Sequence, residues 1–190
     1  MWVFLATEVM FFGGLFTAYT IYRSTHATAF AAASHHLDIL LGTLNTGVLL
    51  TSSLTMALAV HAAQVGERRR TVAFLVATII LGIAFLGIKG LEYHQKFVDH
   101  LAPGASFSFP GTNGREAEMF FYLYFVMTGL HALHMIAGVI VVGVIAGMAG
   151  RGKFTPEYYT PLEMTGLYWH FVDIVWIFLF PLLYLIGNRP

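Results

Sequence analysis

Long runs of apolar residues fill most of the chain, and short polar stretches separate them. A helix needs about 20 mostly apolar residues to cross the hydrocarbon core of a bilayer. Five runs predict transmembrane helices, at residues 2–22, 40–63, 72–97, 119–148 and 162–186. A transmembrane β-barrel would instead show alternating segments of about ten residues. The pattern therefore predicts an all-α membrane protein, a five-transmembrane-helix bundle that forms a single integral membrane domain over residues 1–190.

The connections between these runs are too short to fold a further domain. Residues 23–37 are small and polar and include three histidines, as expected of a connecting segment. The longest connection, 98–115, is rich in residue types that predict turns rather than a helix: Pro103, Gly104, Pro110, Gly111 and Gly114. Any chemistry is therefore expected among the helices.

Composition supports the same fold class. Apolar residues make up 57% of the chain and charged residues 11%, whereas a soluble domain carries about 25% charged residues. Lys plus Arg and Asp plus Glu number 10 each, so no basic field attracts nucleic acid, and none is expected as a partner. Cysteine is absent, which excludes disulfides, thiol catalysis and cysteine metal sites.

The distribution of basic residues predicts how the helices are oriented. Two short connections on one side hold five of them: Arg68, Arg69, Arg70, Arg151 and Lys153. The other side also holds five, which are more widely spread: Arg23, Lys89, Lys96, Arg115 and Arg189. Positive charge in short loops favours the cytoplasmic side of a membrane. The concentration of the first set predicts a cytoplasmic N-terminus and a C-terminus outside.

Glu8 lies two turns into the first predicted helix, in the segment TEVMFFGG. An ionisable side chain at bilayer depth costs several kcal/mol, so it normally faces the bundle interior and finds a partner. The favoured interpretation is a buried carboxyl that is kept neutral or paired, because apolar residues flank it on both sides. The alternative is a residue near the membrane interface.

His131 and His134 are three residues apart in the segment TGLHALHMIAG and therefore share one face of the fourth helix. Two histidines alone leave a metal under-ligated, and the predicted helices supply no cysteine or second histidine pair. Anchoring two haems would need histidines at two depths on neighbouring helices. Interhelical hydrogen bonds are the favoured interpretation.

The fifth predicted helix contains the segment GLYWHFVDIVWIFLF. His170 and Asp173 are three residues apart, so one face of the helix carries an acid and an imidazole, with Trp169 on a related stripe. We weigh a proton relay against a local ion pair that holds helices together, and favour the ion pair.

Two other helices carry polar residues. The third ends in charged and polar residues three or four positions apart, for which a solvated or snorkelling helix end is the simplest interpretation: Lys89, Glu92, Tyr93 and Lys96. The second carries small polar residues that permit close helix approach and interhelical hydrogen bonds: Asn45, Thr46, Thr51, Ser52, Ser53 and Thr55. These residues predict a compact bundle or an interface with a partner. The pattern contains no evident nucleophile, phosphate loop or complete metal site, which favours a supporting subunit over a catalyst.

Motifs in all five predicted helices resemble one family. The segments TEVMFFGGLF, LNTGVLLTSS, LGIAFLGIKGLEYHQKF, YFVMTGLHALHMIAG and LYWHFVDIVWIFLF are similar, in this order, to five consecutive helices of subunit III of the haem–copper oxidases. The resemblance spans nearly the whole chain, and YWHFVDIVW together with TGLHALH is highly specific for the family.

The resemblance implies a chain with no catalytic centre and no haem or copper of its own. Those cofactors belong to partner subunits I and II of an oxidoreductase complex that reduces oxygen to water and pumps protons. Longer members have seven helices, in which a lipid-filled cleft separates the first pair from the other five, and bound phospholipid is expected here too. This chain lacks the first pair. Five-helix versions occur in bacterial quinol oxidases and in some cytochrome c oxidases, so the electron donor stays open.

The resemblance also assigns roles to individual positions. Glu8 matches the family's membrane-embedded carboxyl, which reacts with carbodiimide reagents. The family's histidine pair, its last-helix motif and an acid just before that motif match a polar set in this chain: His131, His134, Glu163, Trp169, His170 and Asp173. Two basic residues fall near those that bind lipid phosphates in longer relatives, namely Arg151 and Lys153.

The implied function is a supporting one in a bacterial cytoplasmic membrane. Subunit III stabilises subunit I, keeps proton uptake into its input channel fast, and slows inactivation during turnover. The alternatives are an independent proton-coupled transporter, with Glu8 and the histidines as its path, and an enzyme with its own haem. A transporter of this size usually shows inverted repeats or broken helix pairs. No internal repeat is evident here, and Pro181 is the only proline within a predicted helix.

Overall fold

The computed structural model describes residues 1–35, 37–101, 103 and 114–185. These residues form helices joined by short connections, and the only β-type pairing among them is a single bridge between Thr155 and Tyr158. Five of the helices are long and apolar enough to cross a membrane. The prediction of an all-α membrane fold with five transmembrane helices is confirmed.

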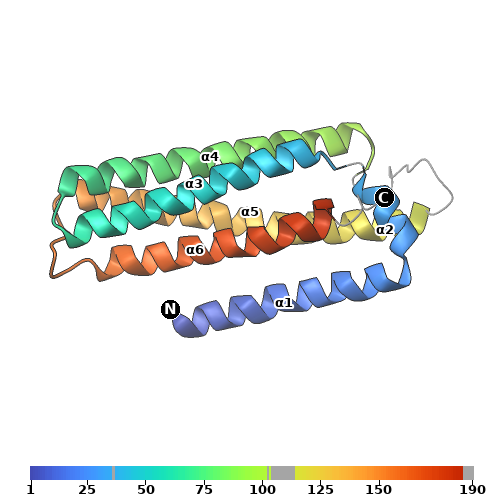
Figure 1. Cartoon of the computed structure of the whole chain (residues 1–190), viewed down its shortest axis with the longest axis horizontal. Coiled ribbons are helices and arrows are strands. Elements are labelled where there is room, and N and C mark those ends of the chain that lie inside the picture. Colours follow the sequence, from blue (N-terminus) through green and yellow to red (C-terminus); the bar gives the residue numbers. More distant parts are fainter. Residues whose placement is uncertain (36, 102, 104–113, 186–190) are drawn as a thin grey trace. The chain divides into compact units, whose positions relative to one another are not determined.

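The long helices follow the predicted apolar runs closely (Figure 1). They are α1 (Trp2–Thr25), α3 (Ile39–Gln64), α4 (Arg68–Val98), α5 (Gly114–Gly150) and α6 (Thr160–Phe180). A π-helical turn, η1 (Pro181–Leu185), continues α6. Pro181 lacks a backbone N–H, which interrupts regular α-helical hydrogen bonding where this turn begins. Helix α5 starts five residues before the predicted run. The prediction missed its first turn because that turn is polar.

One short helix lies within a predicted connection. Helix α2 (Ala27–Ser34) has the sequence ATAFAAAS, and alanine is the strongest helix former. Its Phe30 is buried, with ring centroids 5.5 Å from Tyr19 and 5.4 Å from Phe120. The connection between α1 and α3 therefore contains a short helix that the sequence analysis did not predict. Of the turns predicted in 98–115, those at Gly104, Pro110 and Gly111 lie outside the described residues, and Gly114 begins a helix.

The chain divides into two compact units, which we describe separately. Unit 1 consists of Met1–Thr43, Ile88–His131 and Val175–Pro190, so it holds α1, α2 and η1 with parts of the other helices. Unit 2 consists of Leu44–Gly87 and Ala132–Ile174 and holds the remaining segments of α3, α4, α5 and α6.

Unit 2 packs around the indole of Trp169, which is fully buried. A Cβ atom on Gly82 of α4 would lie 2.8 Å from this indole, and one on Gly138 of α5 would lie 3.1 Å from it. The two glycines therefore let both helices approach the ring closely. Polar contacts join α3 to α4, where the hydroxyls of Thr55 and Thr78 are 2.8 Å apart.

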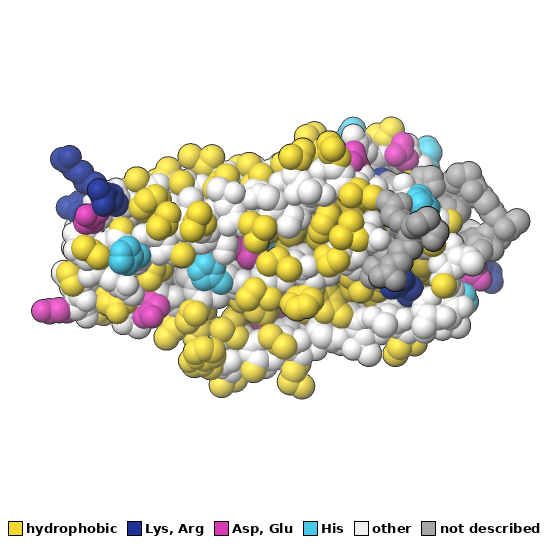
Figure 2. All heavy atoms as spheres, viewed as in Figure 1, with side chains coloured by type: hydrophobic (Ala, Val, Ile, Leu, Met, Phe, Trp, Pro, Cys, Tyr) yellow, Lys and Arg dark blue, Asp and Glu magenta, His cyan; other side chains and the backbone are white. Residues whose placement is uncertain are grey.

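Large apolar side chains remain exposed on the chain, most of all on α1. Trp2, Val3 and Met10 are each more than 70% exposed. Figure 2 shows apolar side chains spread over the face in view. Such surfaces suit helices that lie against lipid or against other membrane helices.

Candidate functional site

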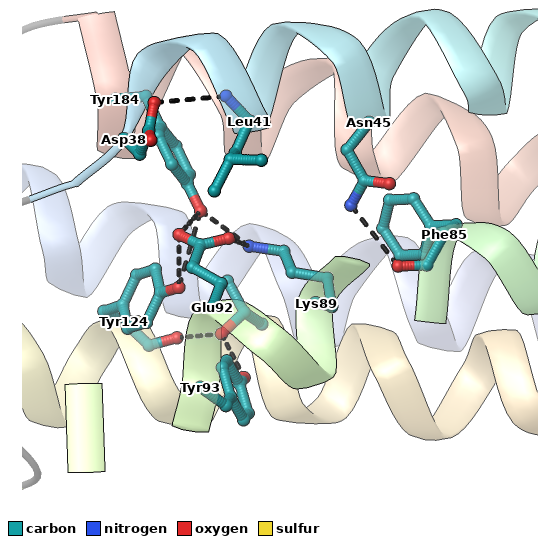
Figure 3. A network of polar contacts seen from close by, with 10 residues as sticks. Asp38, Leu41, Asn45, Phe85, Lys89, Glu92, Tyr93, Tyr124 and Tyr184 are labelled. Carbon is teal, nitrogen blue, oxygen red and sulfur yellow. Dashed lines mark hydrogen bonds and ion pairs between the residues drawn. The ribbon is translucent and has the colours of Figure 1, made fainter. Parts of the chain in front are cut away.

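A cluster of buried polar side chains lies in unit 1, where three elements contribute to it (Figure 3). Lys89 and Glu92 come from successive turns of α4, Tyr124 comes from α5, and Tyr184 comes from η1. The two charged residues are 5% and 2% exposed, and both tyrosines are buried. We call these four residues the Glu92 cluster.

Hydrogen bonds in the Glu92 cluster converge on the carboxylate. The Lys89 ammonium lies 2.9 Å from Glu92 Oε2, and it also donates to the Tyr184 hydroxyl at 2.6 Å. Glu92 Oε1 accepts from the Tyr124 hydroxyl at 3.0 Å and from the Tyr184 hydroxyl in a short hydrogen bond. The carboxylate therefore has one cationic and two neutral donors, which is the kind of pairing that a buried charge requires.

Aromatic rings surround the Lys89 ammonium. Its nitrogen lies 4.6 Å from the ring centroid of Trp176, 5.1 Å from that of Tyr184 and 5.4 Å from that of Tyr124. Rings at these distances attract a cation through their quadrupoles. The His131 ring lies 5.2 Å from the Trp176 ring, at an interplanar angle of 33°. The cation is thus held on one side by a carboxylate and on the others by aromatic faces.

The cluster corrects one interpretation of the sequence. Lys89, Glu92 and Lys96 are at most 6% exposed, so the proposal of a solvated or snorkelling end at this part of α4 is wrong. Tyr93, directly after Glu92, hydrogen-bonds the Thr128 hydroxyl of α5 and is half-buried. Lys89 and Glu92 can be buried because hydroxyl groups of α5 and η1 hydrogen-bond to them, and the spacing of charges along α4 does not show these partners.

This arrangement can fix helix positions. Every polar atom named in the Glu92 cluster bonds to another member of it, and the members belong to α4, α5 and η1. Tyr184 anchors the π-helical turn, a type of irregularity that is frequent at functional sites. The geometry therefore favours a structural pin for the end of α6.

A second polar cluster lies in unit 2, between α3 and α6. Adjacent serines of α3 contact adjacent residues of α6: Trp169 donates from Nε1 to Ser52 Oγ at 3.1 Å, and His170 Nδ1 lies 2.7 Å from Ser53 Oγ. Asp173 is one turn further along α6 and is 3% exposed. The favoured ion pair between His170 and Asp173 is absent from the ion pairs among the described residues, where His170 Nδ1 is paired with Ser53.

The predicted histidine pair is placed on α5. His131 is buried beside Trp176, whereas His134 is half-buried and its backbone carbonyl accepts from the Tyr168 hydroxyl at 3.0 Å. The described residues contain no group of three or more His, Cys, Asp or Glu side chains that could hold a metal ion. The interhelical hydrogen bonds expected of these imidazoles stay a prediction.

The remaining predicted site residues are not brought into either cluster. Glu8 is half-buried on α1 in unit 1, and Glu163 is exposed in the first turn of α6 in unit 2. Arg151 and Lys153 are exposed in the α5–α6 connection. Between them, Gly152 has a φ of +73°, and a Cβ there would lie 3.2 Å from an Arg68 guanidinium nitrogen. The two basic connections of unit 2 are therefore neighbours.

Three proteins similar to the chain are each described as subunit 3 of an oxidase, although the oxidases differ. A family model described as cytochrome c oxidase subunit III matches residues 1–188. The chain is 33% identical, over 97% of its length and 85% of the relative's, to cytochrome c oxidase subunit 3 of Corynebacterium diphtheriae. It is 32% identical to quinol oxidase subunit 3 of Bacillus spizizenii, over 98% of the chain and 85% of the relative. It is 29% identical to cytochrome bo(3) ubiquinol oxidase subunit 3 of Pseudomonas aeruginosa, over 98% and 83%.

Proposed function

Because the chain belongs to the cytochrome c oxidase subunit III family, we propose that it is the supporting, non-redox subunit of a proton-pumping terminal oxidase. The chain is an integral membrane protein, and its relatives are subunits of oxidases that contain other subunits. In this proposal, haem and copper belong to partner subunits I and II, which reduce oxygen to water. Subunit III stabilises subunit I, keeps its proton uptake fast and slows inactivation during turnover.

The observation that carries the supporting role is the closed geometry of the Glu92 cluster. Its charges are directed at each other and at two tyrosines, so they hold helices in place. A rigid bundle of this kind suits a subunit that maintains the shape of a neighbour. The exposed apolar side chains of α1 give such a neighbour, or lipid, a surface to contact.

The proposed location is a bacterial cytoplasmic membrane, with the N-terminus in the cytoplasm and the C-terminus outside. Burial strengthens the argument from charge, because Lys89 and Lys96 of the opposing set are enclosed in unit 1 and do not act as loop charges. Arg189, another member of that set, lies outside the described residues. The basic connections of unit 2 then dominate, which favours a cytoplasmic position for them. Phospholipid phosphates are proposed ligands of Arg151 and Lys153.

The electron donor of the complex is either cytochrome c or a quinol, since similar relatives are described with each. Gentle purification followed by a visible spectrum tests the assignment. We expect the isolated chain to be colourless and the purified complex to show haem bands, and identification of the other subunits would settle the donor. Haem bands in the isolated chain would favour an enzyme with its own haem. A chain that purifies alone and carries protons in vesicles would favour the transporter.

Deletion of the chain tests its role in the complex. The haem spectrum of subunits I and II should be unchanged, while proton uptake should slow, most of all at high pH where protons are scarce. The working lifetime of the oxidase should shorten, and its initial activity at low pH should change little. Stopped-flow oxygen reaction and turnover-to-failure assays measure these effects. Loss of the haem signal, or an unchanged lifetime and pH profile, would contradict the proposal.

A further inference from the structure

The carboxyl group of Asp173 is buried in unit 2 without the partners that an ionised acid needs. The residue is 3% exposed, and neither carboxyl oxygen accepts a hydrogen bond from the described residues. Ser53 of α3 is a polar side chain beside it, and Ser53 also contacts His170, one turn before Asp173 on α6. None of the ion pairs among the described residues includes Asp173.

Burial of an ionised carboxylate without a compensating charge or donor is so unfavourable that the group takes up a proton instead. A protonated carboxyl gains one O–H donor and keeps acceptor capacity. The surroundings of Asp173 therefore suit a neutral acid that donates a hydrogen bond, and Ser53 Oγ can accept it.

Among the described residues, Ser53 makes no side-chain hydrogen bond to its own helix, unlike three other hydroxyl residues around it on α3. Thr51, Ser52 and Thr55 each donate to a backbone carbonyl of their own helix. The hydrogen bond of Ser53 runs instead to another helix, where its Oγ lies 2.7 Å from His170 Nδ1. In the tautomer that carries its proton on Nε2, His170 Nδ1 accepts from the Ser53 hydroxyl, and the lone pairs of Ser53 Oγ then stay available for another donor.

We propose that Asp173, Ser53 and His170 form a site that binds one shared proton. In the resting arrangement, the Asp173 carboxyl holds this proton and donates to Ser53 Oγ, while the Ser53 hydroxyl donates to His170 Nδ1. The neutral imidazole then carries its own proton on Nε2. Transfer of the Asp173 proton to Ser53, together with transfer of the Ser53 proton to Nδ1, gives an aspartate and an imidazolium with the serine restored.

The proposed site stores a proton between two titratable side chains. Asp173 is enclosed, and His170, the titratable side chain joined to it through Ser53, is half-buried. Trp169 and Ser52 beside them are occupied with each other and are not titratable at ordinary pH. The site requires only these contacts within unit 2 and does not depend on the proposed function of the chain.

Infrared difference spectra of the purified oxidase complex, recorded between neutral and alkaline pH, test the site. We expect a protonated-carboxyl C=O band at neutral pH that is lost in Asp173→Asn. The matched control is Asp99→Asn, because Asp99 is exposed just after α4 and should leave the band unchanged. A neutral-pH spectrum without any band that depends on Asp173 would overturn the proposal.

A second variant tests the serine bridge and does not require Asp173 to be replaced. Ser53→Ala removes the acceptor, so the C=O band should move to higher frequency, as expected of a carboxyl that has lost a hydrogen bond. Isotope labelling of aspartate in the otherwise unaltered complex identifies the band even if Asp173→Asn fails to assemble. A band with the same frequency in Ser53→Ala would show that Asp173 and His170 do not share a proton through this residue.

Discussion

In unit 1 the Glu92 carboxylate accepts hydrogen bonds from Lys89, Tyr124 and Tyr184, whereas in unit 2 the Asp173 carboxyl accepts none from the described residues. The two acids are nearly equally buried, at 2% and 3% exposed. Burial alone therefore does not decide the state of an acid within a helix bundle. The hydrogen-bond donors around the acid decide its state. Glu92 is an ionised acid that holds helices together, and Asp173 is a neutral acid that holds a proton.

The contrast follows from the basic residue that lies one turn before each acid and from the partner of that residue. Lys89 precedes Glu92 by three residues, so α4 supplies its own counter-charge. His170 precedes Asp173 by three residues as well, but its Nδ1 is engaged by Ser53 of α3. A helix can thus present an acid and a base at the same spacing and pair them in one place only. The Lys89 ammonium has three donors and bonds both Glu92 and Tyr184, whereas His170 Nδ1 makes a single hydrogen bond, which goes to Ser53.

The largest effect is expected from Lys89→Met, which removes the cation and leaves the Glu92 charge buried. Loss of one partner from a buried ion pair costs about 3–5 kcal/mol. The free energy of unfolding of the subunit in detergent, followed by tryptophan fluorescence during denaturation, should fall by this amount. The variant should also be lost more readily from the purified complex.

A double variant distinguishes charge from packing at Lys89. Lys89→Met combined with Glu92→Gln removes both charges while keeping the size of the side chains, and should recover most of the lost stability. If the double variant were as unstable as Lys89→Met alone, the Glu92 cluster would matter through packing, and its acid would not differ from Asp173 in the way described.

Gly82→Ala sharpens the comparison from the side of unit 2, since it disturbs the indole next to the shared-proton site. The new Cβ would lie 2.8 Å from Trp169 and 3.0 Å from Val139, so the ring or the helices must move. Overpacking of this kind costs about 1–3 kcal/mol. Gly87→Ala on the same helix meets nothing within 4 Å and should leave stability unchanged or raise it slightly. Equal results for the two variants would show that α4 does not pack closely on Trp169.

The helices were predictable from the sequence because hydropathy is a local property. Each apolar run reports its own length, and the bounds of α1, α3 and α4 lie within a few residues of those predicted. The short helix α2 was missed because eight residues carry too little periodicity to separate a helix from a polar connection. The polar first turn of α5 was missed because hydropathy does not count it as part of a span.

Only some members of the polar clusters could be predicted from the sequence. The residues of α4 and α6 could be selected because charged groups are rare in apolar runs, but their partners could not. Tyr184 lies 95 positions from Lys89, and Ser53 lies 117 positions from His170. Neither a tyrosine nor a serine in a membrane helix is unusual, so only the packing of the helices shows which of them supplies a donor.

Tyr184→Phe tests how much the hydroxyl donors add to the Glu92 cluster once its ion pair is intact. The change removes the bonds to Lys89 and Glu92 but keeps the ring. Hydrogen bonds between membrane helices contribute about 0.6–1.7 kcal/mol, and the free energy of unfolding should fall within this range. Tyr122→Phe is the matched control, because Tyr122 is 59% exposed on α5 and should change little. An effect as large as that of Lys89→Met would assign the main stabilising role to Tyr184.

Asp173→Asn should have the smallest effect on stability, and its comparison with Glu92→Gln is the sharpest test of the contrast. An amide has the size of a protonated carboxyl and can donate to Ser53 Oγ, so a neutral acid is replaced by a neutral donor. The loss should stay below about 1 kcal/mol, the scale of one hydrogen bond between membrane helices. Glu92→Gln instead leaves Lys89 as a buried cation without its counter-charge and should cost about 3–5 kcal/mol. Unfolding of both variants in the same detergent gives the two values side by side. If Asp173→Asn destabilised the subunit as much as Glu92→Gln does, Asp173 would be an ionised and paired acid, and the two clusters would work in the same way.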